Sequence, residues 1–370
     1  MKILTITTHF ANNYGALLQS YALCRYLNET EDVECKILNY LPSGPQNYKS
    51  SWTIFHKPKS FRELLKTIYL MFRIDKYKER KHKNGIMRAF IKENLPHTTT
   101  KIFKSTIHRQ KIEADAVICG SDQIWNRDIF TDTAYFLDFV PDGILRIAYA
   151  PSIATPWKEK DSLLIKKMLE RFDSISIREA ANYDQVKRLV PSKSVSVVCD
   201  PIFLLSPEIW ESCAIKPRFT EPYIFCYFLG TSDLAVRTVQ KIRLLTGLKV
   251  IHLNINALDK FNSDYVISEA GPFDFVGLII HAEYVCTNSF HCSAFSIHFR
   301  KNLFTIPNSK RNERLQNLEE QFHVKVVVSE GNYDTITMEN LTTDYELLNR
   351  DGEKYIKDSK SYIINALKKC

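Results

Sequence analysis

The sequence predicts an α/β protein of two Rossmann-like, doubly wound domains, the first of which carries a basic helical insertion. Three observations lead to this prediction. Short apolar runs alternate with helical patterns along most of the chain, as expected for βα units around parallel sheets. The alternation restarts after a connector at 205–217, marked by Ser206-Pro207 and Lys216-Pro217. A chain of 370 residues is also longer than an ordinary domain with a single hydrophobic core, and its length suits two domains.

The first domain is predicted to cover residues 1–205. Its expected elements are a strand at 3–7, a polar loop at 9–15, a helix at 16–28, a strand at 34–39, the helical insertion at about 50–110, and strands at 114–119, 146–149, 174–177 and 196–199. The short apolar run at the start of the chain is interpreted as the first strand, because no long apolar region or cleavage site accompanies it.

The second domain is predicted to cover residues 206–345. Its expected elements are a strand at 223–228, a helix at 233–246, a strand at 249–253, a helix at 272–281, a strand at 284–287, a helix after His291 and a strand near 303–306. The last segment, 346–370, is expected to form a helix that crosses back to the first domain. This organisation predicts a cleft between the two domains.

Composition limits the class of protein. A hydrophobic content of 45% with 25% charged residues is typical of a soluble globular chain, and no apolar run approaches the roughly 20 residues that span a bilayer. Nine cysteines without a CxxC pair indicate reduced thiols in the cytoplasm. The histidines lack metal-ligand spacing, so we expect no metal.

The positive charge is concentrated in one segment. The whole chain carries +8, whereas residues 57–92 alone carry twelve Lys or Arg against three Asp or Glu. Within this segment, apolar residues recur at helical spacing from Phe61 to Phe72. This amphipathic helix could meet an anionic membrane surface or a lipid pyrophosphate, or could pack on the core with solvated charges. Nucleic acid is not an expected partner, because no recognition motif accompanies the charge.

Polar clusters follow several predicted strands, where ligands gather in open α/β sheets. Asn13 and Gly15 precede a helix whose free N–H groups favour an anion, although a simple loop fits equally well. The second cluster, Gly120 to Asn126, places Asp122 and amide side chains around Trp125, which suits a sugar ring. A helix cap explains Ser121 or Asp122 equally well, but not the whole cluster.

Two further clusters supply a cation and a proton carrier. Arg178 offers a planar fork to a carboxylate or phosphate and Glu179 can orient it, although a surface ion pair is the alternative. His291 lies among small polar residues where a helix begins, and histidine exchanges protons near neutral pH. Glu269 precedes the previous helix, so we expect it at a neighbouring strand end, where it could tune His291.

Taken together, these clusters resemble the polysaccharide pyruvyl transferase family. The resemblance covers roughly residues 3–315 and rests on the ordered set Asn13-Tyr14-Gly15-Ala16-Leu17-Leu18-Gln19, Gly120-Ser121-Asp122-Gln123-Ile124-Trp125-Asn126, Tyr149-Ala150-Pro151-Ser152, Ser176-Ile177-Arg178-Glu179, Asp200-Pro201, Ala270-Gly271-Pro272 and Thr287-Asn288-Ser289-Phe290-His291. It implies a GT-B-like pair of domains. It also implies transfer of pyruvate from phosphoenolpyruvate onto two hydroxyls of a sugar, which leaves a cyclic ketal during polysaccharide biosynthesis.

The resemblance also assigns roles. His291 is expected to be the general acid or base, and Asp122 to orient or deprotonate a sugar hydroxyl. The donor-binding residues are Arg178, Asn288, Ser289, Lys301 and Arg311. The acceptor-binding residues are Asn13, Gly15, Gln19, Ser121, Gln123, Trp125, Asn126, Ser152 and Glu269. Some members carry an arginine at the position of Ser289, so a second cation must come from Lys301, Arg311 or Arg314.

Two other functions fit the same architecture. The first is a GT-B glycosyltransferase that uses a nucleotide sugar, and the second is a non-catalytic protein of envelope-polysaccharide assembly. For the pyruvyl transferase, the expected partners are phosphoenolpyruvate and a lipid-linked or nucleotide-linked sugar acceptor, with no cofactor and no metal. The expected location is the cytoplasm, with the basic segment as a contact to the inner face of the membrane.

Overall fold

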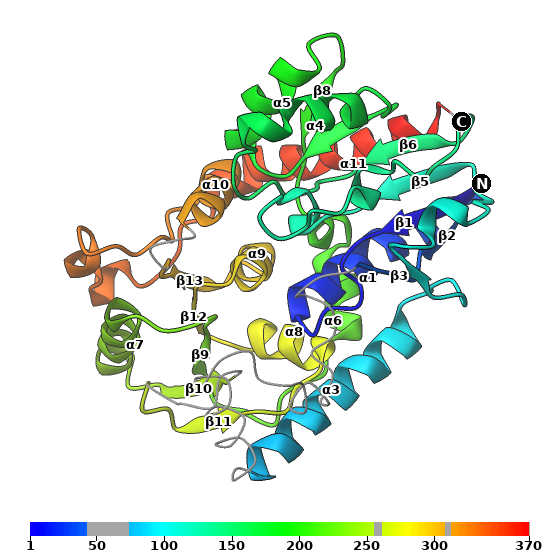
Figure 1. The fold of residues 1–370 in the computed structure, drawn as a ribbon. Helices are drawn as coiled ribbons and strands as arrows, with labels where there is room; N and C mark the ends of the chain where they lie inside the picture. The colour runs from blue at the N-terminus through cyan, green and yellow to red at the C-terminus, as the bar shows by residue number, and fades with distance from the viewer. Residues whose placement is uncertain (43–73, 255–260, 308–311, 370) are drawn as a thin grey trace, which may run out of the picture.

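Two parallel β-sheets form the centres of two α/β units in the computed structural model (Figure 1). The structure describes residues 1–42, 74–254, 261–307 and 312–369. The predicted fold class is confirmed. Among the described residues, no helix combines the length and the apolar character needed to cross a membrane.

The N-terminal unit contains a four-stranded sheet in the order β2-β1-β5-β6. Its strands are β1 (Lys2–Ile6), β2 (Glu34–Ile37), β5 (Ala116–Cys119) and β6 (Leu145–Ala148). A second parallel pair, β7 (Ile175–Ile177) and β8 (Val195–Val197), adjoins β6 through a bridge between Ile147 and Ser174. The helices of this unit are α1 (Tyr14–Asn28), α4 (Ser162–Leu169) and α5 (Tyr183–Leu189). A short pair not predicted from the sequence, β3 (Tyr40–Leu41) and β4 (Ile102–Phe103), lies on either side of the insertion.

The C-terminal unit contains a five-stranded sheet in the order β11-β10-β9-β12-β13. Its strands are β9 (Tyr223–Tyr227), β10 (Lys249–Leu253), β11 (Tyr265–Ile267), β12 (Tyr284–Thr287) and β13 (Asn302–Thr305). Its helices are α6 (Pro207–Cys213), α7 (Asp233–Thr246), α8 (Pro272–Ile280), α9 (Phe290–His298) and α10 (Asn312–Phe322). The clear end signals of α7 explain why its bounds were predictable: Ser232 caps its first turn and Gly247 follows its last turn in a left-handed conformation.

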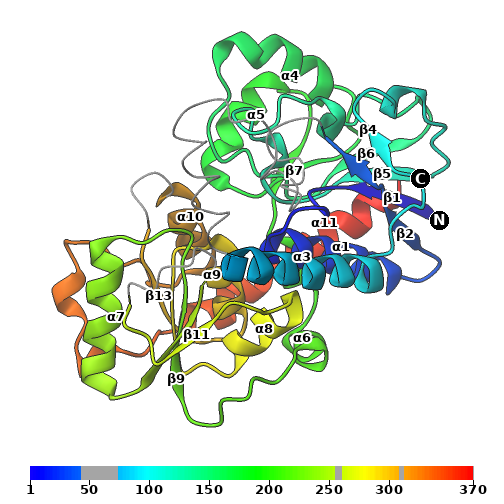
Figure 2. The ribbon, with the colours of Figure 1, turned by 60° about the horizontal axis from the view of Figure 1, so that its bottom comes forward.

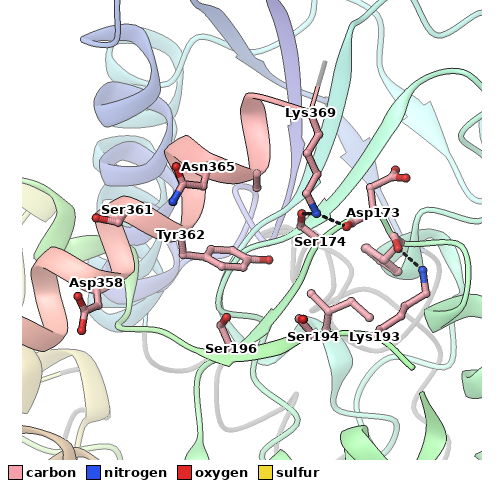
Figure 3. A pocket seen from close by; sticks show the side chains of 13 residues that line it. Asp173, Ser174, Lys193, Ser194, Ser196, Asp358, Ser361, Tyr362, Asn365 and Lys369 are labelled. Carbon is pink, nitrogen blue, oxygen red and sulfur yellow. Dashed lines mark hydrogen bonds between the residues drawn. The ribbon is translucent and has the colours of Figure 1, made fainter. Parts of the chain in front are cut away.

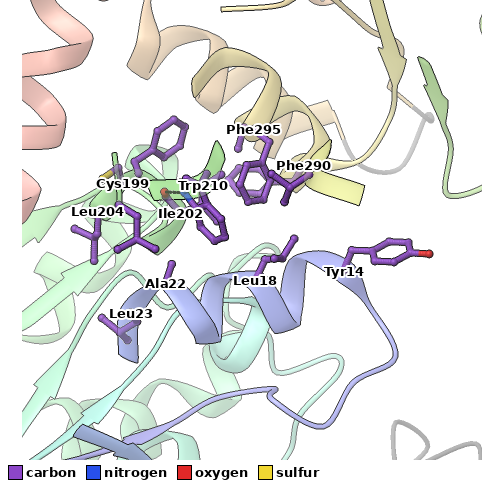
Figure 4. Packing of buried hydrophobic residues seen from close by; sticks show 14 of the residues in the cluster. Tyr14, Leu18, Ala22, Leu23, Cys199, Ile202, Leu204, Trp210, Phe290 and Phe295 are labelled. Atoms are coloured by element: carbon purple, nitrogen blue, oxygen red, sulfur yellow. Dashed lines mark hydrogen bonds between the residues drawn. The ribbon is translucent and has the colours of Figure 1, made fainter. Parts of the chain in front are cut away.

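Helix α1 lies between the two units and joins their cores. It faces Trp210, Phe290 and Phe295 of the C-terminal half (Figure 4). The ring of Tyr14 stacks on that of Phe275, with centroids 4.8 Å apart. One apolar core therefore continues from the first unit into the second.

The C-terminal helix α11 (Glu353–Leu367) returns to the N-terminal unit (Figure 1). The hydroxyl of Tyr362 donates to the carbonyl oxygen of Ala148 over 2.9 Å, and the backbone N–H of Cys199 donates to Ser359 Oγ over 2.9 Å. The helix thus touches the segment that follows β8.

The described part of the basic insertion is the long helix α3 (Ile74–Asn94), which lies across α1 in Figure 2. Met87 and Phe90 of this helix join the core, and the ring of Phe90 lies 5.0 Å from that of Phe273. From residue 81 on, α3 therefore packs one face on the core, and Lys83 also turns inward, with its Nζ 5.2 Å from the centroid of the Tyr14 ring. The predicted amphipathic face at 61–72 lies outside the described residues.

Candidate functional site

The carboxylate of Asp200 lies at the centre of a buried polar network that joins the two units. Its Oδ2 accepts a hydrogen bond from Arg178 Nη1 over 2.7 Å and another from Ser121 Oγ over 3.2 Å. The same oxygen lies 3.5 Å from Nε2 of His291. Its Oδ1 accepts from the backbone N–H of Ile202, the second residue of a short 3₁₀ turn at Pro201–Leu204. Sequence reasoning missed Asp200 as a site residue, although it noted the Asp200-Pro201 pair.

His291 occupies the first turn of α9, directly after β12. Its side chain is 10% exposed. Nε2 is buried and faces Asp200 at a distance longer than a well-formed hydrogen bond, so the remaining exposure belongs to the rest of the ring. The Nδ1 side of the ring packs against Gly15, where an added Cβ would lie 2.0 Å from Nδ1. Gly15 therefore permits the close approach of α1 to the imidazole.

Arg178 follows β7 and is 1% exposed. Besides its bond to Asp200, its Nε donates to Glu179 Oε1 over 3.1 Å. The guanidinium carbon lies 4.1 Å from the centroid of the Phe290 ring, which fits a cation–π contact. Nη2 is buried and has no hydrogen-bond partner among the described residues. The hydrogen-bonding capacity of this nitrogen is therefore unused by the described residues.

The electrostatics of the network favour a charged Asp200. Burial raises the pKa of this carboxyl, but the facing His291 and the Arg178 guanidinium outweigh burial and hold the pKa well below its usual range. For Arg178, burial lowers the pKa, whereas the carboxylates of Glu179 and Asp200 raise it, with a net increase. The network therefore contains one permanent cation, two acidic groups and a titratable imidazole.

Asp122 stands beside this network in a strained backbone conformation. Its φ of 72° is unusual for a residue with a side chain. Its Oδ2 accepts a hydrogen bond from Thr8 Oγ1 over 2.6 Å, and its carbonyl oxygen accepts from the Ser152 N–H over 2.8 Å. Ser121, the preceding residue, contacts Asp200. The structure thus brings Asp122 to the strand ends that also carry Arg178 and Asp200, and strain of this kind often marks functional sites.

Two predicted acceptor residues belong to the core, and their assignment was wrong. Trp125 is fully buried, stacks on Phe136 with centroids 5.0 Å apart, and donates its indole N–H to the carbonyl oxygen of Tyr135. It offers no face to a sugar, because burying the ring is more favourable than exposing it. Gln19 is also fully buried, and its Nε2 donates to Thr7 Oγ1 over 2.9 Å. This bond ties α1 to the end of β1.

The positions of Glu269 and Lys301 do not fit the roles predicted for them either. Glu269 follows β11, which β10 and β9 separate from β12, and its carboxylate lies 3.5 Å from His82 rather than beside His291. Lys301 precedes β13 at the opposite edge of the sheet, and its Nζ donates to the carbonyl oxygen of Ile280. Arg311 lies outside the described residues, and Arg314 lies in the first turn of α10.

The remaining predicted residues shape the strand ends. Asn288 links the end of β12 to the loop after β9, since its Oδ1 accepts from the Leu229 N–H and its Nδ2 donates to the Gly230 carbonyl oxygen. The amides of Gln123 and Asn126 bond each other, and Ser152 is fully buried. Asn13 caps α1 and Ser289 caps α9, each through a side-chain oxygen.

The arrangement provides the parts for proton transfer beside an anion. An imidazole with one nitrogen facing a carboxylate can exchange a proton at the other nitrogen. The first turn of α9 and the Nη2 atom of Arg178 add N–H donors close by. The fold therefore brings together His291, Arg178 and Asp122, which lie in three separate segments of the sequence.

Comparison with known proteins gives a family and a fold. A family model described as polysaccharide pyruvyl transferase matches residues 13–310. A UDP-GlcNAc 2-epimerase from Neisseria meningitidis is 12% identical, with a TM-score of 0.54 and 100% of each chain covered. A heptosyltransferase from E. coli is also 12% identical, with a TM-score of 0.44, 97% of this chain and 100% of that chain covered. A comparison with curated proteins finds no match. The likeness to the epimerase concerns the fold alone, and it agrees with two α/β units built on parallel sheets.

Proposed function

Because the chain belongs to the polysaccharide pyruvyl transferase family, we propose that it moves pyruvate from phosphoenolpyruvate onto two hydroxyls of one sugar. In the proposed reaction, the methylene carbon of the donor takes up a proton and C2 becomes electrophilic. One sugar hydroxyl adds to C2. The second hydroxyl then displaces phosphate, and the products are a cyclic ketal and inorganic phosphate.

The observation that best supports this proposal is the Asp200 network. Asp200 contacts Arg178 from one unit and faces His291 from the other, so a cation and a proton carrier share one carboxylate. A donor with a carboxylate and a phosphate needs cationic and N–H contacts, and its carbon–carbon double bond needs an acid. The Asp200 network offers both kinds of group.

In this proposal, His291 transfers the proton at Nδ1. The negative charge of Asp200 favours a proton on Nε2, which is buried and faces it. Nδ1 is then free to act as acid toward the donor or as base toward a hydroxyl. It packs against Gly15 at the start of α1, so in this proposal the donor reaches Nδ1 when this turn shifts.

Arg178 and Asp122 take supporting parts in the proposal. Nη2 of Arg178 would hold the donor carboxylate or phosphate, together with the N–H groups that begin α9. Because Asp200 and Glu179 already bind the guanidinium, this contact would orient the anion more than attract it. Asp122, whose Oδ2 is held by Thr8, would accept a proton from a sugar hydroxyl or orient it.

The test is phosphate release from phosphoenolpyruvate with a panel of lipid-linked and nucleotide-linked hexoses. His291→Ala should abolish release without unfolding the protein. His108→Ala is the matched control, because His108 is exposed and lies 3.7 Å from Asp138. More than a few per cent of wild-type activity in His291→Ala would refute the proposed role. Thermal stabilisation by UDP or GDP, but not by phosphoenolpyruvate, would instead favour a glycosyltransferase.

A further inference from the structure

A cavity of about 520 Å³ lies on the N-terminal unit, away from the Asp200 network (Figure 3). It is bounded by α11 on one side and by β7, β8 and the residues that precede them on the other. Asp173 and Ser174 line it before β7 begins, whereas Arg178 follows the end of that strand. The cavity therefore opens at the other end of β7 from the candidate active site.

Six of the thirteen residues that line this cavity carry neutral polar side chains. Ser194 and Ser196 come from the β8 segment, while Ser361 and Asn365 come from α11. Hydroxyls both donate and accept hydrogen bonds, and an amide offers two donors and an acceptor. Such a lining matches a ligand that itself carries hydrogen-bond donors and acceptors on each face.

Tyr362 gives the cavity a fixed aromatic surface. Its ring lies among the serines of the lining (Figure 3). Its hydroxyl donates to the carbonyl oxygen of Ala148. The bond anchors the far end of the ring, so the ring keeps one orientation toward the cavity. Aromatic faces of this kind pack against the C–H groups of a ligand.

The charges around the cavity are balanced. The charged residues that line the cavity are two lysines, Lys193 and Lys369, and two aspartates, Asp173 and Asp358. Both ammonium groups are engaged by protein oxygens, since Lys369 Nζ donates to the Asp173 carbonyl oxygen over 2.8 Å and Lys193 Nζ donates to that of Phe172. No excess of positive charge is present to attract a phosphate. The lining therefore suits an uncharged ligand better than an anion.

From these contacts we propose that this cavity is a second carbohydrate-binding site, which takes one neutral sugar unit. The ring of the sugar packs on Tyr362, and its hydroxyls bond to Asn365, Ser361 and Ser196. The site is separate from the reacting centre and does not depend on which donor the enzyme uses. It would let the protein hold a saccharide by a unit that is not being modified.

The test is titration of the full chain with neutral trisaccharides, namely maltotriose, cellotriose and triacetylchitotriose, followed by calorimetry. At least one should bind in the millimolar range. Asn365→Ala should weaken binding by at least about fivefold, the effect of one lost hydrogen bond, and Ser361→Trp should abolish it by filling the cavity. Asn340→Ala, an exposed position in the C-terminal half, should bind like the wild type.

Three results would overturn the proposal: failure of all three trisaccharides to bind the wild type, binding that survives Ser361→Trp, or binding of inorganic phosphate in the cavity instead. Circular dichroism of each variant separates loss of binding from loss of fold. The His291→Ala protein should bind the trisaccharide normally while it releases no phosphate. Trisaccharide binding without any use of phosphoenolpyruvate would refute the proposed reaction and leave this site standing.

Discussion

Asp200→Asn is the sharpest test of the network, because it removes one charge and keeps the shape of the side chain. Oδ2 of Asp200 is bonded to Arg178 Nη1 at 2.7 Å and lies 3.5 Å from His291 Nε2. An asparagine amide cannot accept at its nitrogen and carries no charge. Breaking a buried ion pair costs about 3–5 kcal/mol, and Glu179 still neutralises Arg178, so we expect a loss near the lower figure.

The same substitution should also lower the rate of catalysis. Without the carboxylate, Nε2 of His291 is no longer favoured as the protonated nitrogen, and positioned acid–base groups contribute about 10²–10⁴-fold to a rate. We expect kcat for phosphate release to fall within that range, with little change in KM for phosphoenolpyruvate. Urea unfolding and steady-state phosphate release measure the two effects on the same protein.

The pH dependence of unfolding gives an independent check. Because burial is outweighed by His291 and Arg178, the folded-state pKa of Asp200 lies below its unfolded value. Its contribution to stability is then complete above the unfolded pKa of about 3.9 and is lost as the pH falls toward the folded value. Asp200→Asn should lack this acid-labile part. A variant with wild-type kcat, or with the wild-type pH profile of unfolding, would refute the reasoning.

Two further predictions follow from single residues. Gly15→Ala places a Cβ 2.0 Å from Nδ1 of the imidazole and should lower turnover by about a hundredfold. Gly85→Ala is the control: a Cβ there meets nothing within 4 Å, so this variant should keep wild-type turnover and gain about 1 kcal/mol of stability. Equal turnover of the two variants would contradict the prediction. Burial lowers the pKa of His9 and of His298 from 6.5 to about 4. The contribution of each neutral histidine to the free energy of unfolding should therefore be complete above pH 6.5. It should fall by up to about 3 kcal/mol per histidine as the pH drops from 6.5 to about 4. Thermal melts at stepped pH measure this loss, and a melting temperature that stays constant from pH 7 to pH 4 would rule it out.

The sequence predicted elements well where both the apolar pattern and the end signals were strong. The bounds predicted at 233–246, 249–253 and 284–287 match α7, β10 and β12. The short helices α4 and α5 were not predicted, because seven or eight residues give too few turns for a clear helical period.

The site was predictable only in part, because contacts across the two units leave no local signal. Arg178 and His291 could be singled out by their place at predicted strand ends. Asp200 also follows a predicted strand, at 196–199, but its place at the centre of the network could not be predicted, because that depends on neighbours 22 and 91 positions away in the chain. Trp125 was misjudged because a polar run after a strand suggested exposure, whereas the chain turns back at Asp122 and returns the indole to the interior.

The position of α1 limits how substrates can enter. A rigid-body opening of the two halves would separate Tyr14 from Phe275 and expose the apolar surface around Trp210. Each large side chain exposed in this way would cost about 2 kcal/mol. The open state of such a hinge would therefore have a very low population. A local displacement of the turn before α1, by contrast, would uncover the imidazole and leave these apolar contacts in place.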